Sequence, residues 1–121
     1  MARILIAEDD PSMRAFITKA LERAGHTVQA EEDGLKALES LGKTCRFDLL
    51  LTDIVMPGID GIELAQKASH LCPEMKVMFI TGFAAVAMDA KSKKPNTTKV
   101  LSKPFHLNDL VKQVDQLLDV A

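Results

Sequence analysis

Residues 47–61 read FDLLLTDIVMPGIDG, and this stretch decides the class of fold. Phe47–Thr52 is a short, nearly continuous apolar run, which is typical of a strand buried on both faces of a sheet. Pro57-Gly58 then interrupts the chain in a loop. From Gly61 to about His70, apolar residues recur at helical spacing. The stretch therefore predicts a strand, a loop and a helix, with the carboxylate of Asp53 directly after the strand.

The same kind of unit recurs on both sides of this stretch. The other predicted strands are short apolar runs at Arg3–Ala7, Lys76–Ile80 and Lys99–Ser102, with a weaker, edge-type strand at Thr27–Ala30. Helical periodicity is found at residues 13–24, 35–41 and 107–118 in addition to 61–70. Parallel strands need crossover connections, and these connections cover the faces of the sheet. The alternation therefore predicts an α/β fold, a doubly wound parallel sheet with helices on both faces.

Composition excludes several classes of function. The chain has 121 residues, 47% of them hydrophobic, which predicts one domain, residues 1–121, with its own core. A net charge of −2 and the absence of Trp and Tyr argue against a nucleic-acid or membrane partner. The longest nearly apolar stretch, Val77–Met88, is too short to span a bilayer, and the N-terminus lacks a secretion signal. We therefore expect a cytoplasmic protein.

The cysteines and histidines show no metal-ligand spacing. Cys45 and Cys72 are 27 residues apart, with no CxxC motif. In a cytoplasmic protein we expect them to be reduced and to behave as small apolar residues. We expect His26, His70 and His106 to lie at the surface.

Residues that could carry chemistry follow four of the predicted strands. Glu8 and Asp9 follow the first strand, Asp53 the third, Thr81 the fourth and Lys103 the fifth. In an open parallel sheet, ligands bind beyond the carboxyl ends of the strands. We therefore expect the carboxylates, the hydroxyl and the amine to meet at one edge.

Carboxylates at neighbouring strand ends repel one another unless a positive charge compensates them. A hard divalent cation such as Mg²⁺ suits Glu8, Asp9 and Asp53, because its preferred ligands are oxygens. Lys103 could reach a phosphate oxygen, and Thr81 could donate a hydrogen bond to another. Asp53 is then a candidate nucleophile that accepts a phosphoryl group as an acyl phosphate.

These motifs resemble the receiver domain of two-component response regulators. The resemblance rests on four stretches and covers essentially the whole chain: residues 4–10, 51–61, 80–82 and 103–105, which read ILIAEDD, LTDIVMPGIDG, ITG and KPF. It implies a flavodoxin-like fold, a five-stranded sheet of order 2-1-3-4-5 with five helices. It also implies a phosphoacceptor protein rather than an enzyme, with Mg²⁺-dependent self-phosphorylation and slow self-dephosphorylation.

Position by position, the resemblance makes Asp53 the phosphoacceptor. Asp9 becomes a Mg²⁺ ligand, Glu8 an acid acting mainly through metal-bound water, and the backbone carbonyl of Val55 a further ligand. Thr81 and Lys103 become the switch residues that contact the phosphoryl group. Asp10 falls outside the acidic pair and is expected to be solvated.

The remaining expectations concern the switch. The Lys103–Pro104 bond is cis in this family, and Phe83, with Val55, could shield the acyl phosphate from water. The chain departs from the family at Val100, where an aromatic residue usually reports phosphorylation. It departs again at residues 91–99, which are rich in Lys and contain Pro95, so we expect the fourth helix to be short or irregular.

Two further stretches, residues 81–87 and 99–111, resemble the CpdR-type single-domain regulators. We expect the chain to be a monomer. The resemblance implies that it receives phosphate through a histidine kinase or histidine phosphotransferase. It also implies a phosphorylation-dependent partner, a protease or unfoldase of the ClpXP type or its adaptor. A passive phosphate sink or shuttle is the alternative, because it would share every residue of the site. A dehalogenase-like phosphatase would need DxDxT after its strand, whereas Ile54 and Val55 follow Asp53 here.

Overall fold

The computed structural model describes residues 2–81, 98–102 and 105–118, and for Thr81 and residues 98–102 it describes the backbone only. Five parallel strands form one sheet of order β2-β1-β3-β4-β5, which confirms the predicted order. The strands are β1 (Arg3–Ala7), β2 (Thr27–Glu31), β3 (Leu49–Asp53), β4 (Lys76–Thr81) and β5 (Thr98–Ser102). The edge position predicted for residues 27–30 is also correct, since β2 has only one neighbour.

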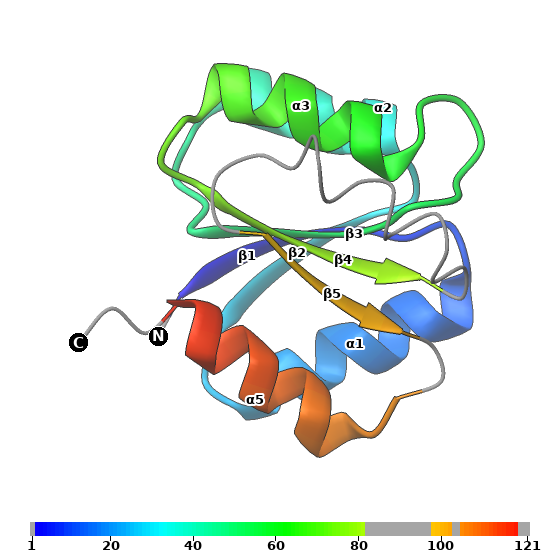
Figure 1. The fold of residues 1–121 in the computed structure, drawn as a ribbon, viewed down its shortest axis with the longest axis vertical. Coiled ribbons are helices and arrows are strands. Elements are labelled where there is room, and N and C mark those ends of the chain that lie inside the picture. The colour runs from blue at the N-terminus through cyan, green and yellow to red at the C-terminus, as the bar shows by residue number, and fades with distance from the viewer. Residues whose placement is uncertain (1, 82–97, 103–104, 119–121) are drawn as a thin grey trace.

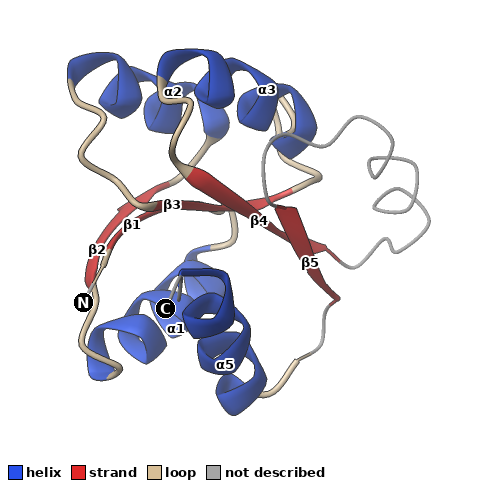
Figure 2. Cartoon of the chain, turned by 60° about the vertical axis from the view of Figure 1, so that its left-hand side comes forward, coloured by secondary structure: helices blue, strands red, loops and turns tan. Residues whose placement is uncertain are grey.

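Helices cover both faces of the sheet, as Figures 1 and 2 show. Two helices, α2 (Gly34–Lys43) and α3 (Gly61–Leu71), lie side by side on one face. The other two described helices, α1 (Pro11–Arg23) and α5 (Leu107–Leu118), lie on the opposite face. Residues 82–97, where the short fourth helix is expected, lie outside the described residues.

Each central strand supplies side chains to two separate cores. Leu50 and Phe79 pack in the core under α2 and α3, together with Leu64 and Ala68. The next residue along β3, Leu51, packs instead in the core over α1 and α5. Because successive side chains of a strand point to opposite faces, a continuous apolar run fills both cores. This alternation explains why β3 is buried at all five positions.

The structure corrects one boundary in the stretch that decides the fold. Strand β3 begins at Leu49, whereas the prediction placed its start at Phe47. Phe47 is buried all the same, in the core under α2 and α3. At its other end β3 includes Asp53 as its last residue. The backbone of Asp53 is fixed by the pairing of β3 with β4, in which Asp53 lies opposite Ile80.

The prediction for the cysteines is wrong in this structure, because Cys45 and Cys72 form a disulfide with their Cα atoms 5.6 Å apart. The physical reason lies in the topology. Helices α2 and α3 are both crossovers that return from the carboxyl end of the sheet to its amino end. Their last residues therefore meet at the same edge, although 27 positions separate the two cysteines in sequence.

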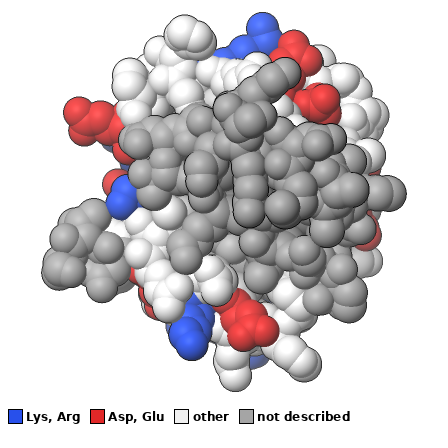
Figure 3. Space-filling model, viewed as in Figure 1, with Lys and Arg blue, Asp and Glu red and all other residues white. Residues whose placement is uncertain are grey.

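The described surface carries charges of both signs. On the face in Figure 3, acidic and basic side chains lie near one another in small groups above and below the region drawn in grey. Among the described helices, none has the length and apolar character that a membrane crossing requires.

Candidate functional site

Three carboxylates come together at the carboxyl ends of two neighbouring strands. Strands β1 and β3 are paired, with Ala7 opposite Thr52. Glu8 and Asp9 follow β1 directly, and Asp53 ends β3. One carboxylate oxygen from each of the three acids lies within 4.8 Å of the others. We call these three residues the acidic cluster; Glu8 is 1% exposed and Asp53 is 8% exposed.

Backbone contacts fix Glu8 at the base of the cluster. Its N–H donates to the carbonyl oxygen of Glu31, 3.1 Å away, which continues the pairing of β1 with β2. Its own carbonyl oxygen accepts from Nη1 of Arg14 at 2.8 Å. Its carboxylate oxygen Oε2 accepts from the backbone N–H of Asp10 at 3.2 Å. The buried carboxylate is therefore held in position by the chain that follows β1.

Asp10 has a structural role that the sequence analysis missed. It is exposed, as expected, but it is also the N-cap of α1. Its Oδ1 accepts from the N–H groups of Ser12 at 2.9 Å and Met13 at 3.4 Å. These are donors that the first turn of a helix leaves without a partner. An Asp immediately before Pro11 was the signal available in the sequence.

The loop between β3 and α3 wraps around Asp53. The N–H of Val55 donates to Oδ1 of Asp53 at 3.4 Å. The N–H of Gly61 donates to the carbonyl oxygen of Ile54 at 2.7 Å, which returns the chain to the strand end. A Cβ atom on Gly61 would lie 2.0 Å from the carbonyl oxygen of Asp53. Only glycine allows the start of α3 to approach the acidic strand end this closely.

The acidic cluster has the donor set that a hard cation requires. Carboxylates at such separations repel by roughly 3–4 kcal/mol per pair at an effective dielectric constant of about 20. The three carboxylates all offer oxygen atoms, the ligands preferred by a small hard ion such as Mg²⁺. Val55, which is 51% exposed, places its backbone beside this cluster. The residues present therefore fit a magnesium site.

The other expected site residues lie on the neighbouring strands or outside the described residues. Thr81 ends β4, one position beyond Ile80, the residue paired with Asp53. Val100 lies within β5, opposite Phe79 of β4. Phe83, Lys103 and Pro104 are outside the described residues, and so is the proposed cis bond. Thr81 therefore reaches the same edge of the sheet as the acidic cluster by its backbone position.

A doubly wound parallel sheet with an acidic cluster at adjacent strand ends defines the class of receiver-like α/β domains. Residues 4–115 match the family model of the response regulator receiver domain. The chain belongs to this family, which confirms the resemblance found in its sequence.

Individual relatives agree with this assignment. The chain is 55% identical over 121 residues to the response regulator receiver protein CpdR of Brucella abortus, covering 100% of both chains. Two other curated relatives are longer proteins: the chain covers 50% of the response regulator MprA of Mycobacterium ulcerans, at 29% identity, and 13% of the sensor kinase CckA of Brucella abortus, at 30% identity.

Solved structures give the same result. The receiver domain of the hybrid histidine kinase CckA is 32% identical, with a TM-score of 0.83 over 97% of this chain and 99% of that one. The response regulator TrrA of Thermotoga maritima, solved with Mg²⁺ and BeF, is 28% identical, with a TM-score of 0.86 over 97% and 99% of the two chains.

Proposed function

We propose that this chain is a stand-alone response regulator, a single receiver domain that accepts a phosphoryl group on Asp53. The observation that carries the proposal is the acidic cluster, which surrounds a strand-end carboxylate with two further acids. In the proposed step, an Asp53 carboxylate oxygen forms a bond to phosphorus while the bond from phosphorus to a donor histidine nitrogen breaks. The imidazole leaves with the electron pair of that bond and can then take up a proton.

The residues around Asp53 have separate proposed tasks. Glu8, Asp9 and Asp53 would hold Mg²⁺, with the backbone carbonyl of Val55, and Glu8 would act mainly through metal-bound water. The bound ion would supply positive charge against the carboxylates and the phosphoryl oxygens. Thr81 and Lys103 are proposed to contact those oxygens and to move with them. The Mg²⁺ and BeF found with TrrA, a relative in fold and sequence, support this assignment.

The test is the intact mass of the purified chain after incubation with acetyl phosphate and Mg²⁺. We expect an adduct of about 80 Da, the mass of one phosphoryl group. The Asp53→Asn variant should show no adduct. The Asp10→Asn variant is the matched control, because asparagine also caps a helix and Asp10 lies outside the acidic cluster. An adduct that persists on Asp53→Asn would show that another residue is the acceptor.

We also propose that phosphorylation controls the affinity for a protein partner, a protease or unfoldase of the ClpXP type or its adaptor. The full-length similarity to CpdR supports this proposal. Phosphorylation adds roughly 1.5 to 2 negative charges at one strand end, and a partner that distinguishes the two states must respond to that change.

The proposed output can be tested by capture of ClpX and its adaptors on the immobilised chain, with and without beryllofluoride. We expect retention in the absence of beryllofluoride only. Equal capture in both states, or none, would favour a phosphate sink that has no output partner. Asp53→Ala should remain in the partner-binding form under both conditions.

A further inference from the structure

The disulfide lies at the end of the molecule opposite the acidic cluster. Cys72 is the C-cap of α3 and is 3% exposed, in the core under α2 and α3. Cys45 is exposed, in the connection from α2 to β3. Cys45 is therefore the solvent-accessible residue of the pair, while Cys72 is enclosed. This asymmetry determines which sulfur a reactant from solution can attack.

An open cavity of about 960 Å³ gives access to this disulfide. Both cysteines line it, together with the apolar side chains of Phe47, Leu71 and Met75. Such a volume is in the range that accommodates a small organic molecule. The cavity therefore offers space for a low-molecular-weight thiol beside the two cysteines.

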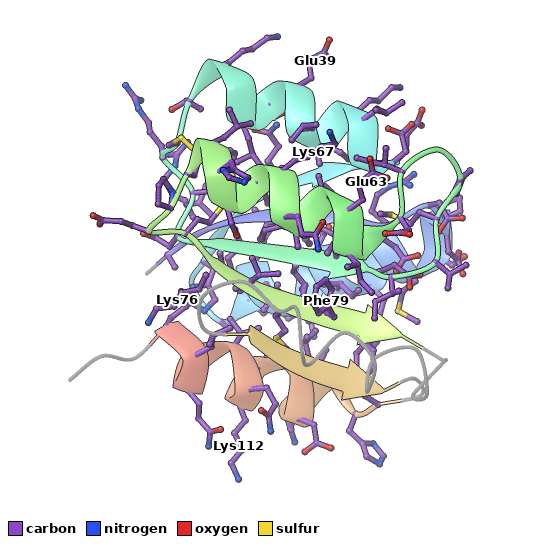
Figure 4. The ribbon with its side chains drawn as sticks, turned by 45° about the horizontal axis from the view of Figure 1, so that its top comes forward. Glu39, Glu63, Lys67, Lys76, Phe79 and Lys112 are labelled. Carbon is purple, nitrogen blue, oxygen red and sulfur yellow. A yellow bond between two sulfur atoms is a disulfide. The ribbon has the colours of Figure 1, made fainter. Side chains whose placement is uncertain are left out.

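The disulfide closes a covalent ring around the phosphoacceptor region. The ring runs from Cys45 through β3, Asp53 and the whole of α3 to Cys72. Helices α2 and α3 both begin at the edge of the sheet that holds the acidic cluster and end near the disulfide, and they lie side by side in Figure 4. At the other end, the start of α2 packs against Ile59 in the loop that precedes α3. A Cβ atom on Gly34 would lie only 2.8 Å from Cγ1 of Ile59.

The core next to this bond is built mainly from apolar packing. The cluster under α2 and α3 contains aliphatic and aromatic side chains from both helices and from β1, β3 and β4. A chain of 121 residues buries enough apolar surface to fold without a disulfide. Reduction should therefore leave a folded domain in which the ends of α2 and α3 are no longer linked.

From these observations we infer that Cys45 and Cys72 form a reversible thiol–disulfide site whose reactants are low-molecular-weight thiols and their disulfides. In reduction, a thiolate attacks Sγ of Cys45, the bond to Cys72 breaks, and Cys72 leaves as a thiolate that takes up a proton. A second thiol then attacks the mixed disulfide at the small-molecule sulfur. The balance is one protein disulfide and two thiols converted to two protein thiols and one small disulfide. Oxidation is the reverse, with the small disulfide as oxidant.

The experiment uses the full chain in glutathione buffers of graded redox ratio, quenched by alkylation in denaturant and weighed intact. We expect no alkyl groups at the oxidising end, two at the reducing end, and a reversible transition between them. The melting temperature should fall on the order of 10 °C on reduction. Without the disulfide, the unfolded chain has more conformational entropy, and this favours unfolding. Far-ultraviolet circular dichroism should remain that of a folded α/β domain in both states.

Two variants separate the site from a general effect of reductant. Cys45→Ser changes an exposed residue outside the core. The melting temperature of this variant should equal that of the reduced wild type and should not change with the glutathione redox ratio. Cys72→Ser should form a mixed disulfide with glutathione at Cys45. In Cys45→Ser, the enclosed Cys72 should react far more slowly.

Three results would overturn the inference. The first is two alkylated thiols at every redox ratio, which would mean that the bond does not form. The second is loss of the folded spectrum on reduction, which would make the bond a structural requirement rather than a reversible site. The third is equal reactivity of Cys45 and Cys72 in the two single variants. Because none of these readouts involves phosphorylation, they do not depend on the proposed function.

Discussion

At the scale of single residues, Gly61 imposes the strictest requirement on the site. Replacement by alanine would place a Cβ atom 2.0 Å from the carbonyl oxygen of Asp53 and 2.8 Å from Cα of Ile54. Because backbone atoms cannot move aside as a side-chain tip can, α3 or the end of β3 must shift. We expect Gly61→Ala to lower the free energy of unfolding by about 3 kcal/mol or more, measured by urea denaturation.

The matched control for this substitution is Gly42→Ala. Gly42 lies in α2, and among the described residues no atom outside its chain neighbours and its own helix backbone lies within 4 Å of where its Cβ would be. Alanine there should stabilise the protein by about 0.5–1 kcal/mol through its better helix propensity. Equal effects at the two positions would contradict the close approach of α3 to Asp53.

The acidic cluster predicts a response to Mg²⁺ at the same scale. An ion that binds the folded state alone stabilises it by mass action, so Mg²⁺ at ten times its Kd should raise the melting temperature by about 5 °C. Asp9→Asn should reduce this shift. Asp48→Asn, at the opposite edge of the sheet, should retain it, since an amide oxygen can still accept from the N–H of Arg3.

Chelation of Mg²⁺ should also stop phosphoryl uptake from acetyl phosphate, and uptake undiminished in chelator would exclude the metal site.

At the scale of secondary-structure elements, α1 depends on its cap. Asp10→Ala removes the acceptor for the N–H groups of Ser12 and Met13 and should destabilise the protein by about 1 kcal/mol. Asp10→Asn should restore most of the loss. Thermal denaturation of the two variants side by side checks this prediction, and equal melting temperatures for alanine and asparagine would contradict the capping role.

Elements could be predicted from the sequence where one periodicity dominated. The apolar runs at β1, β3 and β4 and the helical spacing of α1 and α5 are local patterns that tertiary packing reinforces. The boundary of β3 could not be predicted as well, because Phe47 continues the apolar run while lying outside the strand. Hydrophobicity reports burial, and a buried loop residue has the same signature as a buried strand residue.

At the scale of the whole molecule, two apolar cores on opposite faces of the sheet both stabilise the fold. Leu50 and Leu51 are neighbours in sequence and are both fully buried, but they belong to different cores. Alanine at either position should cost about 2–5 kcal/mol in urea denaturation. Leu35→Ala, at a side chain that is 56% exposed, should cost well under 1 kcal/mol. A small effect at one of the two buried leucines would mean that the corresponding face is not packed as described.

Local patterns in the amino-acid sequence are enough to predict the class of fold and the edge of the sheet at which the three carboxylates gather. Short apolar runs that alternate with segments of helical periodicity predict a parallel sheet. All strands of a parallel sheet have their carboxyl ends at the same edge. Only the tertiary structure decided which residues approach one another across that arrangement. The contact of Gly61 with Asp53, the packing of Gly34 on Ile59 and the pairing of Cys45 with Cys72 join segments whose separation in sequence carries no distance information. Such contacts depend on where complete helices come to rest on the sheet, which is fixed by packing between elements rather than by any local pattern.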